Sequence, residues 1–223
     1  MRTSHRFLAA LLSVGLLVCL LSSAVYLLGT NAPLMQSLML RTAPPDTSLL
    51  PEAGYPNAVR AITDYLTGAA DEFQFTFMLD GTEYLGFNAR EQAHMADCRT
   101  LFSLCRWLAV GSFVLCAVLI GLLIHHRRKA DFALLAKLLR SETAVLVILG
   151  VIAAFGFTDA FVLFHRLMFR NDLWLLNPQT DLLIRLMPTA FFERYALLIA
   201  GCFLGGAALA EGLALWAAHC LEK

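Results

Sequence analysis

The stretch FLAALLSVGLLVCLLSSAVYLL, residues 7–28, contains no charged side chain. A helix needs roughly 20 mostly apolar residues to cross the hydrocarbon of a bilayer. Later stretches also qualify: residues 107–124 carry no charge, and residues 143–164 and 195–218 carry one charge each, Asp159 and Glu211. The pattern predicts an all-α membrane protein with four transmembrane helices.

The composition also favours a membrane protein. Of the 223 residues, 59% are hydrophobic and 15% are charged, against about 45–50% and about 25% in soluble domains. Lysine plus arginine number 17, as do aspartate plus glutamate, so the formal net charge is zero. This composition excludes a disordered chain, and the balanced charge indicates no nucleic-acid partner.

Residues 7–28 have a second interpretation, a secretory signal with Arg2 and Arg6 as its basic region. The apolar stretch is longer than the about 7–15 residues typical of a signal. A valine precedes Cys19, where a lipid-attachment site needs a small residue. We therefore expect a retained membrane anchor.

Basic residues near the membrane ends predict the orientation. The run HHRRK at residues 125–129 is followed by Lys137 and Arg140, and every lysine of the chain lies on this side of the expected membrane. We expect both termini in the cytoplasm. The expected order is N-terminus and helix 1 (1–30), an extracytoplasmic domain (31–88), a helix running into helix 2 (89–124), a basic cytoplasmic loop (125–142), helix 3 (143–165), an extracytoplasmic segment (166–190), and helix 4 with the C-terminus (191–223).

The segment between helices 1 and 2 is expected to form a small α+β domain. An amphipathic pattern predicts a short helix over residues 57–68. Asp80-Gly81 between the aromatic-rich residues 73–79 and 83–87 predicts a β-hairpin. Asn88 and Glu91 have the spacing of a capping box, which predicts a helix start. Residues 31–56, which include Pro44-Pro45, Pro51 and Pro56, receive no assignment.

Two of the six histidines, His94 and His165, lie near the outer membrane ends of helices 2 and 3. They meet if these helices pack together. Helical spacing places Glu91, Asp97 and Cys98 beside His94. A dense set of polar side chains follows His165 within nine residues: Arg166, Arg170, Asn171, Asp172 and Trp174.

Each of these features also has a simpler interpretation. Amphipathic residues gather at membrane interfaces without a catalytic role. Asp159 precedes Arg166 by seven residues, which favours a structural ion pair, because ionisable groups at membrane depth need partners. Cys98 offers a thiolate nucleophile, a less favoured alternative. Gly201, Gly205 and Gly206 predict a close-packing face inside the helix bundle.

Two stretches make the chain resemble the lipoprotein intramolecular transacylase family (Lit) of bacterial membrane enzymes. One is EQAHMAD at residues 91–97. The other begins at His165 and continues through NDLW at 171–174, NP at 177–178 and TD at 180–181 to FF at 191–192. The resemblance covers nearly the whole chain. It departs at Asn177, where the family commonly has aspartate, and at Cys98, where it commonly has valine.

The resemblance implies an acyltransferase. The sn-2 acyl chain of a diacylglyceryl lipoprotein would move to the α-amine of its N-terminal cysteine, giving a lyso-form lipoprotein. His94 and His165 would be the essential histidines, serving as general base and acid. Candidate oxyanion or substrate donors are Arg166, Arg170, Asn171 and Trp174, and candidate supporting residues are Glu91, Asp97, Asp159 and Asp172.

The expected partners are diacylglyceryl lipoproteins and membrane lipid, at an outward-facing site in the bacterial cytoplasmic membrane. We expect no cofactor and no metal. The alternatives are a non-catalytic membrane assembly or binding protein and a haem-binding redox protein with histidine ligands. A zinc hydrolase is a third alternative, although no histidine pair has the ligand spacing.

Overall fold

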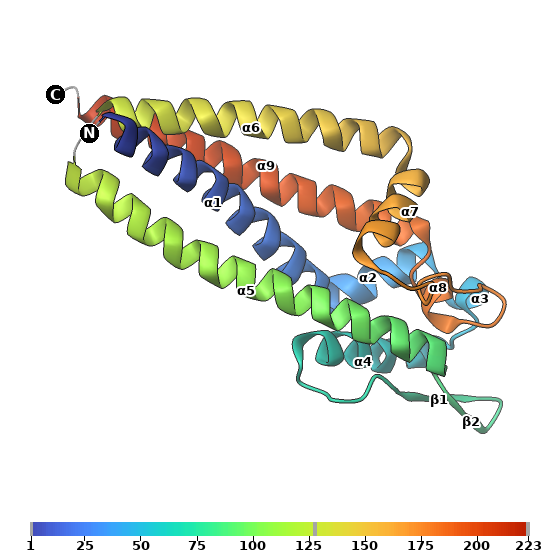
Figure 1. Cartoon of the computed structure of the whole chain (residues 1–223). Coiled ribbons are helices and arrows are strands. Elements are labelled where there is room, and N and C mark those ends of the chain that lie inside the picture. Colours follow the sequence, from blue (N-terminus) through green and yellow to red (C-terminus); the bar gives the residue numbers. More distant parts are fainter. Residues whose placement is uncertain (1, 127–128, 222–223) are drawn as a thin grey trace. The chain divides into compact units, whose positions relative to one another are not determined.

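The computed structural model describes residues 2–126 and 129–221 and is dominated by helices (Figure 1). Within the described residues, four helices are long and apolar enough to cross a membrane, namely α1, α5, α6 and α9, as predicted. The elements are α1 (Arg2–Gly29), α2 (Ala32–Thr42), α3 (Pro45–Ser48), η1 (Glu52–Gly54), α4 (Tyr55–Thr67), β1 (Thr76–Leu79), β2 (Thr82–Leu85), α5 (Ala89–His126), α6 (Lys129–Phe155), α7 (Phe157–Met168), α8 (Leu182–Leu186) and α9 (Thr189–Cys220).

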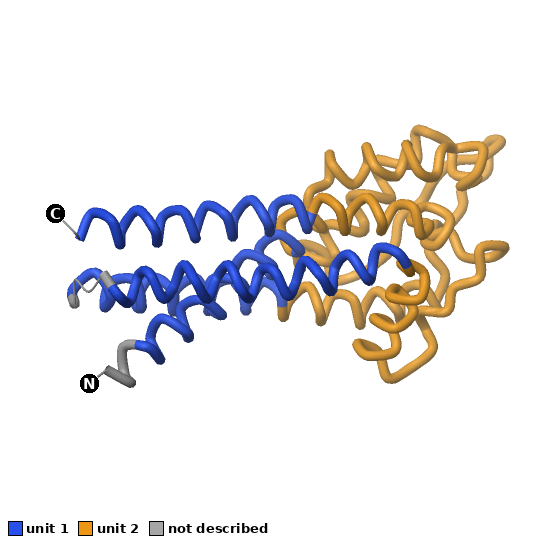
Figure 2. Tube along the Cα trace, turned by 90° about the horizontal axis from the view of Figure 1, so that it is seen from above, with its two compact units in different colours: residues 1–25, 105–155, 199–223 blue, residues 26–104, 156–198 orange. Residues whose placement is uncertain are grey.

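The chain divides into two compact units (Figure 2). Each unit has its own hydrophobic core. Unit 1 comprises residues 1–25, 105–155 and 199–223. Unit 2 comprises residues 26–104 and 156–198. Unit 2 therefore draws on more of the chain than the expected domain over residues 31–88, because side chains from the beginning of α5, from α8 and from the beginning of α9 belong to the same core.

Unit 1 consists of apolar helical segments. In α6 the buried side chains Phe132, Leu135, Ala136 and Leu139 recur at the spacing of one helix face. Large apolar side chains elsewhere on these helices stay exposed, among them Phe113 in α5 (67%) and Ile152 in α6 (64%). Exposed apolar surface of this extent is typical of helices that lie in lipid.

The third long helix differs from the prediction at both ends. Residues 129–142, expected in the cytoplasmic loop, are helical, while residues 127–128 of that loop lie outside the described part of the chain. The expected single helix over residues 143–165 is interrupted at Gly156, which has φ −126° and ψ 52°. The charges of residues 129–142 concealed the apolar period of 132–139, and Gly156 is the residue best able to leave the helical conformation.

The expected glycine packing face in α9 is only partly right. A Cβ atom on Gly206 would lie 2.6 Å from Leu20 Cδ2, so this glycine allows α1 and α9 to approach. Gly201 and Gly205, by contrast, would meet no atom within 4 Å in the described part of the chain. The Gly-x-x-x-Gly pair itself therefore does not pack closely against the described residues, whereas the neighbouring Gly206 does.

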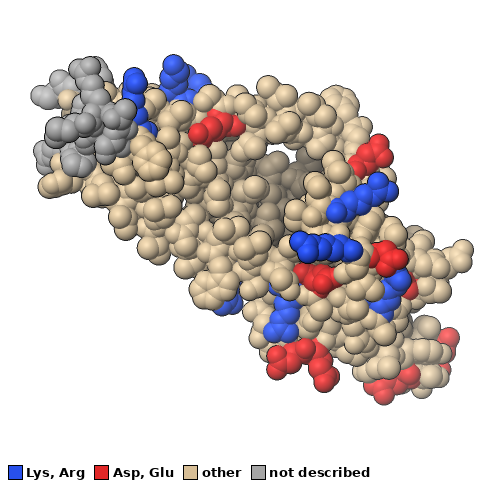
Figure 3. Space-filling view, in the orientation of Figure 1, with Lys and Arg blue, Asp and Glu red and all other residues tan. Residues whose placement is uncertain are grey.

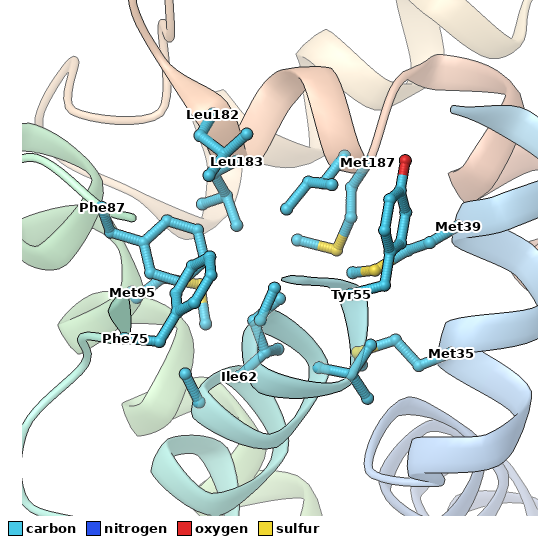
Figure 4. Packing of buried hydrophobic residues seen from close by; sticks show 14 of the residues in the cluster. Met35, Met39, Tyr55, Ile62, Phe75, Phe87, Met95, Leu182, Leu183 and Met187 are labelled. Carbon is cyan, nitrogen blue, oxygen red and sulfur yellow. The ribbon is translucent and has the colours of Figure 1, made fainter. Parts of the chain in front are cut away.

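Unit 2 packs helices and loops around an apolar core, where side chains from α2, α4, α5 and α8 point toward one another (Figure 4). The amphipathic helix predicted over residues 57–68 is confirmed as α4, with Val59, Ile62 and Leu66 buried. The unassigned residues 31–56 form α2, α3 and η1. The side chain of Asn31 caps α2 by accepting a hydrogen bond from Leu34 N at 2.9 Å.

The predicted β-hairpin is also confirmed, with shorter strands than expected. β1 and β2 pair antiparallel, and Phe77 stands opposite Tyr84. Asp80 and Gly81 connect them with φ 50° and 78°, the positive values that a two-residue hairpin turn requires. Before the hairpin, Phe73 stacks on Phe87 with ring centroids 4.2 Å apart, which joins the hairpin base to the core.

Candidate functional site

A capping box fixes the start of α5 and therefore the position of His94. Asn88 Oδ1 accepts a hydrogen bond from Glu91 N at 3.1 Å, and Glu91 Oε2 accepts one from Asn88 N at 2.7 Å. The reciprocal pair satisfies helix-end donors that have no partner within the helix. The predicted helix start is confirmed. One turn later, Met95 enters the core (Figure 4) and His94 lies beside it, also buried.

Glu91 also ties α5 to α8. Its carboxylate is 1% exposed, and Oε1 accepts a hydrogen bond from the backbone N–H of Leu183. Burial raises the free energy of a carboxylate unless hydrogen bonds compensate. Both oxygens of Glu91 are occupied, so this side chain is a structural connection between two elements of unit 2.

A second buried carboxylate, Asp181, stabilises the loop before α8. It accepts hydrogen bonds from Asn177 N at 2.7 Å, Thr180 Oγ1 at 2.8 Å and Asn88 Nδ2 at 2.8 Å. Burial raises the pKa of the Asp181 carboxyl, but these hydrogen bonds outweigh burial, and the net pKa lies below its usual value. The loop that follows His165 is therefore anchored on the cap of α5.

His165 lies in the last turn of α7, where Nδ1 is 2.7 Å from the carbonyl oxygen of Phe161. A carbonyl oxygen only accepts, so Nδ1 carries the hydrogen of this bond, and in the neutral ring Nε2 holds the lone pair. Burial lowers the pKa of His165 below its usual value. The geometry and the burial both favour a neutral imidazole that can accept a proton.

The structure brings the two histidines together, with ring centroids 6.2 Å apart. Phe169 contacts both rings, at 5.3 Å from His94 and 5.5 Å from His165. His94 is 7% exposed and His165 is 8% exposed. The pair thus lies in a largely apolar setting, where hydrogen bonds to a substrate are strengthened.

The two nitrogens of His94 differ in their surroundings. Nε2 lies 3.6 Å from Cys98 Sγ, one helical turn further along α5. Nδ1 is buried and has no hydrogen-bond partner among the described residues. An unsatisfied buried nitrogen costs about 1–3 kcal/mol, so an incoming polar group at this atom gains a bond that the protein leaves unmade.

Two of the predicted donors already have partners. Asn171 Nδ2 donates to Asp97 Oδ2 at 2.9 Å, and Trp174 Nε1 donates to the carbonyl oxygen of Asn171 at 3.0 Å. The indole ring of Trp174 lies 5.0 Å from the ring of His165. Asp97 therefore does not orient His94. It fixes the turn that carries Trp174 against His165.

The remaining predicted residues are more exposed. Asp172 approaches Arg90, with Oδ1 at 3.9 Å from Nη2. The guanidinium groups of Arg166 and Arg170 have no hydrogen bond or ion pair among the described residues, and both side chains are exposed. Figure 3 shows acidic and basic side chains interspersed over the elements of unit 2.

The expected ion pair between Asp159 and Arg166 is wrong for the described structure. Asp159 is exposed and lies in the first turn of α7, and Arg166 lies in the last turn. The break at Gly156 places Asp159 near a helix N-terminus, where the helix dipole favours a negative charge without a paired cation.

Sequence reasoning missed Asp181 and Phe169 as parts of this region. Thr180-Asp181 before the apolar run of α8 was a detectable helix-start signal. No local pattern indicates that Phe169 contacts both histidines, because that contact depends on the fold. Within the described residues, no group of three or more His, Cys, Asp or Glu side chains is arranged to hold a metal ion.

Comparisons with known proteins identify the architecture. A sequence profile described as lipoprotein intramolecular transacylase Lit matches residues 10–192. The in meso structure of the membrane-integral lipoprotein intramolecular transacylase Lit from Bacillus cereus superposes with a TM-score of 0.80 at 19% identity, covering 97% of each chain.

Structures of the same Bacillus cereus protein with one histidine replaced by arginine or by alanine superpose with a TM-score of 0.75 each. Their identities are 18% and 19%, over 96% of this chain and 92% and 93% of theirs. At these identities the likeness establishes the fold. No curated protein matches the chain by sequence.

Proposed function

Because the chain belongs to the lipoprotein intramolecular transacylase family, we propose that it moves the sn-2 acyl chain of a diacylglyceryl lipoprotein to the α-amine of the same N-terminal cysteine. The observation that carries the proposal is the buried pair His94 and His165, 6.2 Å apart in unit 2. A multi-pass membrane protein with four spanning helices gives such a lipid-anchored substrate access from the bilayer.

His165 is the proposed general base. Its Nδ1–H is held by the Phe161 carbonyl at 2.7 Å, so Nε2 offers its lone pair to the substrate amine. An α-amine has a pKa of about 8, so a useful fraction is neutral near pH 7. The amine nitrogen attacks the sn-2 ester carbonyl while Nε2 takes a proton from it, forming the new C–N bond.

His94 is the proposed acid. The buried Nδ1 without a partner suits an N–H that donates first to the developing oxyanion and then to the leaving oxygen. The C–O bond to the sn-2 position breaks, and the alkoxide receives this proton. Cys98 Sγ, 3.6 Å from Nε2, supports this tautomer if its S–H points at Nε2. The proton that His165 took from the amine then passes to His94, which has given up its own, so both imidazoles end neutral as they began.

Positioning carries much of the proposed catalysis. Amine and ester belong to one molecule, so the enzyme has to hold them in a reactive geometry, and no covalent enzyme intermediate is needed. Trp174, fixed by the bonds of Asn171, packs against His165 and keeps its ring in place. Arg166 and Arg170, which have no partner among the described residues, are the proposed donors for polar groups of the substrate.

We propose that this site faces outside, with both termini in the cytoplasm. The basic run at residues 125–129 supports this orientation by the positive-inside rule. Fusions of a periplasm-active reporter after residue 85 and after residue 126 test it. Activity after residue 85 only is expected, and activity after residue 126 only would reverse the orientation.

Mass spectrometry of lipoprotein N-terminal peptides tests the proposed reaction. The host is a strain whose lipoproteins carry a diacylglyceryl group and a free amine, expressing the native chain, His94→Ala, His165→Ala or His219→Ala. His219 lies in unit 1 and serves as the matched control.

We expect the native chain and His219→Ala to give N-acyl, S-monoacylglyceryl peptides, and the other variants to leave the diacyl form. Diacyl peptides with the native chain present in the membrane would contradict the proposal and favour a binding protein. A visible absorption band of the purified chain that is lost in both site variants would favour haem binding instead.

A further inference from the structure

Arg185 is a cation of unit 2 that the proposed acyl transfer leaves unused. It lies in α8, and its neighbours Leu182, Leu183 and Met187 belong to the apolar core (Figure 4). Arg185 is only partly exposed, and its Nε is buried without a hydrogen-bond partner among the described residues. A charged group at the edge of an apolar core is costly unless an acceptor meets its N–H donors.

The carboxylates beside α8 do not supply that acceptor. Both oxygens of Glu91 are occupied, by Leu183 N and by Asn88 N, and those of Asp181 are occupied by loop and cap donors. Burial raises the pKa of Glu91, and the charge of Arg185, acting at longer range, lowers it only in part. In the described part of the chain, Arg185 forms no hydrogen bond or ion pair. Its fork of N–H donors is therefore available to a group from outside the chain.

Glu91 connects Arg185 to the histidine pair. Glu91 precedes His94 by three residues of α5, and Leu183, which donates to Glu91, precedes Arg185 by two residues of α8. With these short helical steps, the Cα atoms of His94 and Arg185 are at most about 20 Å apart. An extended peptide covers about 3.3 Å per residue. A substrate held at the histidines therefore brings about its first six residues within reach of Arg185.

The chemistry of Arg185 favours the peptide part of such a substrate. The acyl chains carry acceptors only in their two esters, on the glyceryl group that the proposed reaction holds at the histidines. Backbone carbonyl oxygens, by contrast, occur in every lipoprotein whatever its sequence. A guanidinium group, with its planar fork of donors, binds two such oxygens at once.

We propose that Arg185 binds backbone carbonyl oxygens of the lipoprotein, within about the first six residues, and so holds the α-amine near His94 and His165. This inference rests on the proposed acyl transfer and adds a residue that binds the peptide. Because the contact is the same in the ground state and the transition state, its loss raises KM and leaves kcat nearly unchanged.

Kinetics with two substrates test the proposal. One is a lipopeptide in which about six residues follow the diacylglyceryl cysteine, and the other is S-diacylglyceryl cysteamine, which has the same amine and esters but no peptide. For Arg185→Gln we expect KM for the lipopeptide to rise about tenfold or more. Its kcat should stay within about twofold, and its kinetics with the cysteamine substrate should match the native chain. Arg194→Gln, at an exposed arginine of unit 2, is the matched control and should behave as the native chain with both substrates.

The native chain provides a second measurement that does not depend on the folding of a variant. Its KM should be about tenfold or more lower for the lipopeptide than for the cysteamine substrate. Equal KM values for these two substrates would overturn the proposal. Equal losses of Arg185→Gln with both substrates would overturn it too, and would instead assign Arg185 to the fold or to membrane lipid.

Failure of the proposed function itself has a different signature, the absence of acyl transfer by the native chain with either substrate. Fluorescence anisotropy of a labelled lipopeptide then decides the Arg185 contact separately. A Kd about tenfold higher for Arg185→Gln than for Arg194→Gln would support the contact, and equal Kd values would overturn it.

Discussion

Unit 1 and unit 2 differ in how their polar side chains connect the elements. In unit 1 single side-chain pairs join the helices, as Ser13 with Glu142 at 3.0 Å and the exposed Arg140, through Nε, with Glu211 at 2.7 Å. In unit 2 the carboxylates of Glu91 and Asp181 each accept several hydrogen bonds, mainly from loop and helix-end groups.

This difference indicates which unit is suited to a reactive site. Single polar pairs join the apolar helices of unit 1, whereas the shared carboxylates of unit 2 fix loops and helix ends, which gives the rigid support that catalysis needs. His94 Nδ1 is buried without a partner among the described residues, as is Arg185 Nε, and in the proposed mechanism Nδ1 is the atom that meets the substrate. Changes in unit 2 should therefore reduce activity, and comparable changes in unit 1 should alter stability alone.

The largest effect is expected from pH, through His165. Burial lowers the pKa of this imidazole below the usual value of about 6.5, so the base is lost only when pH falls through that lower value. Below pH 8 the substrate amine alone makes log kcat/KM rise with slope one. Below the pKa of His165 we expect slope two, a further tenfold loss per pH unit, measured with purified chain and a diacylglyceryl lipopeptide.

The lowered pKa of His165 also makes the free energy of unfolding depend on pH, in the same direction. The unfolded chain takes up a proton at His165 more readily than the folded chain does, so the free energy of unfolding should decrease as pH falls below about 6.5. His165→Ala should retain slope one throughout. A steepening centred above pH 6.5 would contradict the assignment.

Glu91→Gln is expected to produce the next largest effect. One amide N–H₂ would replace an oxygen that accepts from Asn88 N or Leu183 N, leaving a buried donor facing a donor. We expect a loss of about 1–3 kcal/mol in the free energy of unfolding, measured by thermal unfolding in detergent. Glu193→Gln, at an exposed position, should lose less than about 0.5 kcal/mol. Equal losses would show that Glu91 is not a structural connection.

The hydrogen bond between Asp97 and Asn171 gives a smaller effect. Asp97→Ala and Asn171→Ala should each lower kcat/KM by about two- to tenfold, because the turn holding Trp174 loosens, and the double variant should be no worse than either. A double-mutant cycle on kcat/KM measures the coupling. Arg90→Ala with Asp172→Ala is the comparison cycle, where the exposed ion pair should couple by about 0–1 kcal/mol. Strict additivity for Asp97 and Asn171 would remove their positioning role.

The smallest effect separates two neighbouring glycines of unit 1. Gly205→Ala should raise the unfolding free energy by up to about 1 kcal/mol, because alanine favours the helix and the Cβ meets open space. Gly206→Ala should be less stable than Gly205→Ala by about 1–2 kcal/mol, since its Cβ would press on Leu20. Both variants should keep full activity. A loss of activity in Gly205→Ala would break the separation between the units.

Sequence patterns predicted the parts of the molecule that local chemistry determines. The apolar stretches gave the spanning helices, Asp80-Gly81 gave the hairpin turn, and Asn88 with Glu91 gave the start of α5. The prediction was wrong at two places: it missed the helix break at Gly156, and it assigned residues 129–142 to a loop although they are helical. In the first case a single glycine carries little signal, and in the second the charges concealed the apolar period.

The sequence allowed the two histidines of the candidate site to be predicted, but it gave little information on the contacts around them. Helix packing indicated that His94 and His165 could meet, because both lie near the same ends of adjacent helices. The bond of Asn171 to Asp97 was not predictable, since it joins a turn to a distant helix, and neither was the contact of Trp174 with His165. The role of Phe169 between the rings likewise depends on tertiary contacts that no spacing encodes.

The most direct test of the histidine mechanism is a single-turnover measurement with purified native chain, His94→Ala and His165→Ala. The substrate is an equal mixture of two diacylglyceryl lipopeptides, one unlabelled and one labelled with deuterium on the sn-2 acyl chain and with ¹⁵N on its N-terminal cysteine. We predict that the native chain gives N-acyl products in which both labels stay together. Each variant should react at least 100-fold more slowly. Products with scrambled labels, or variants as fast as the native chain, would contradict the account.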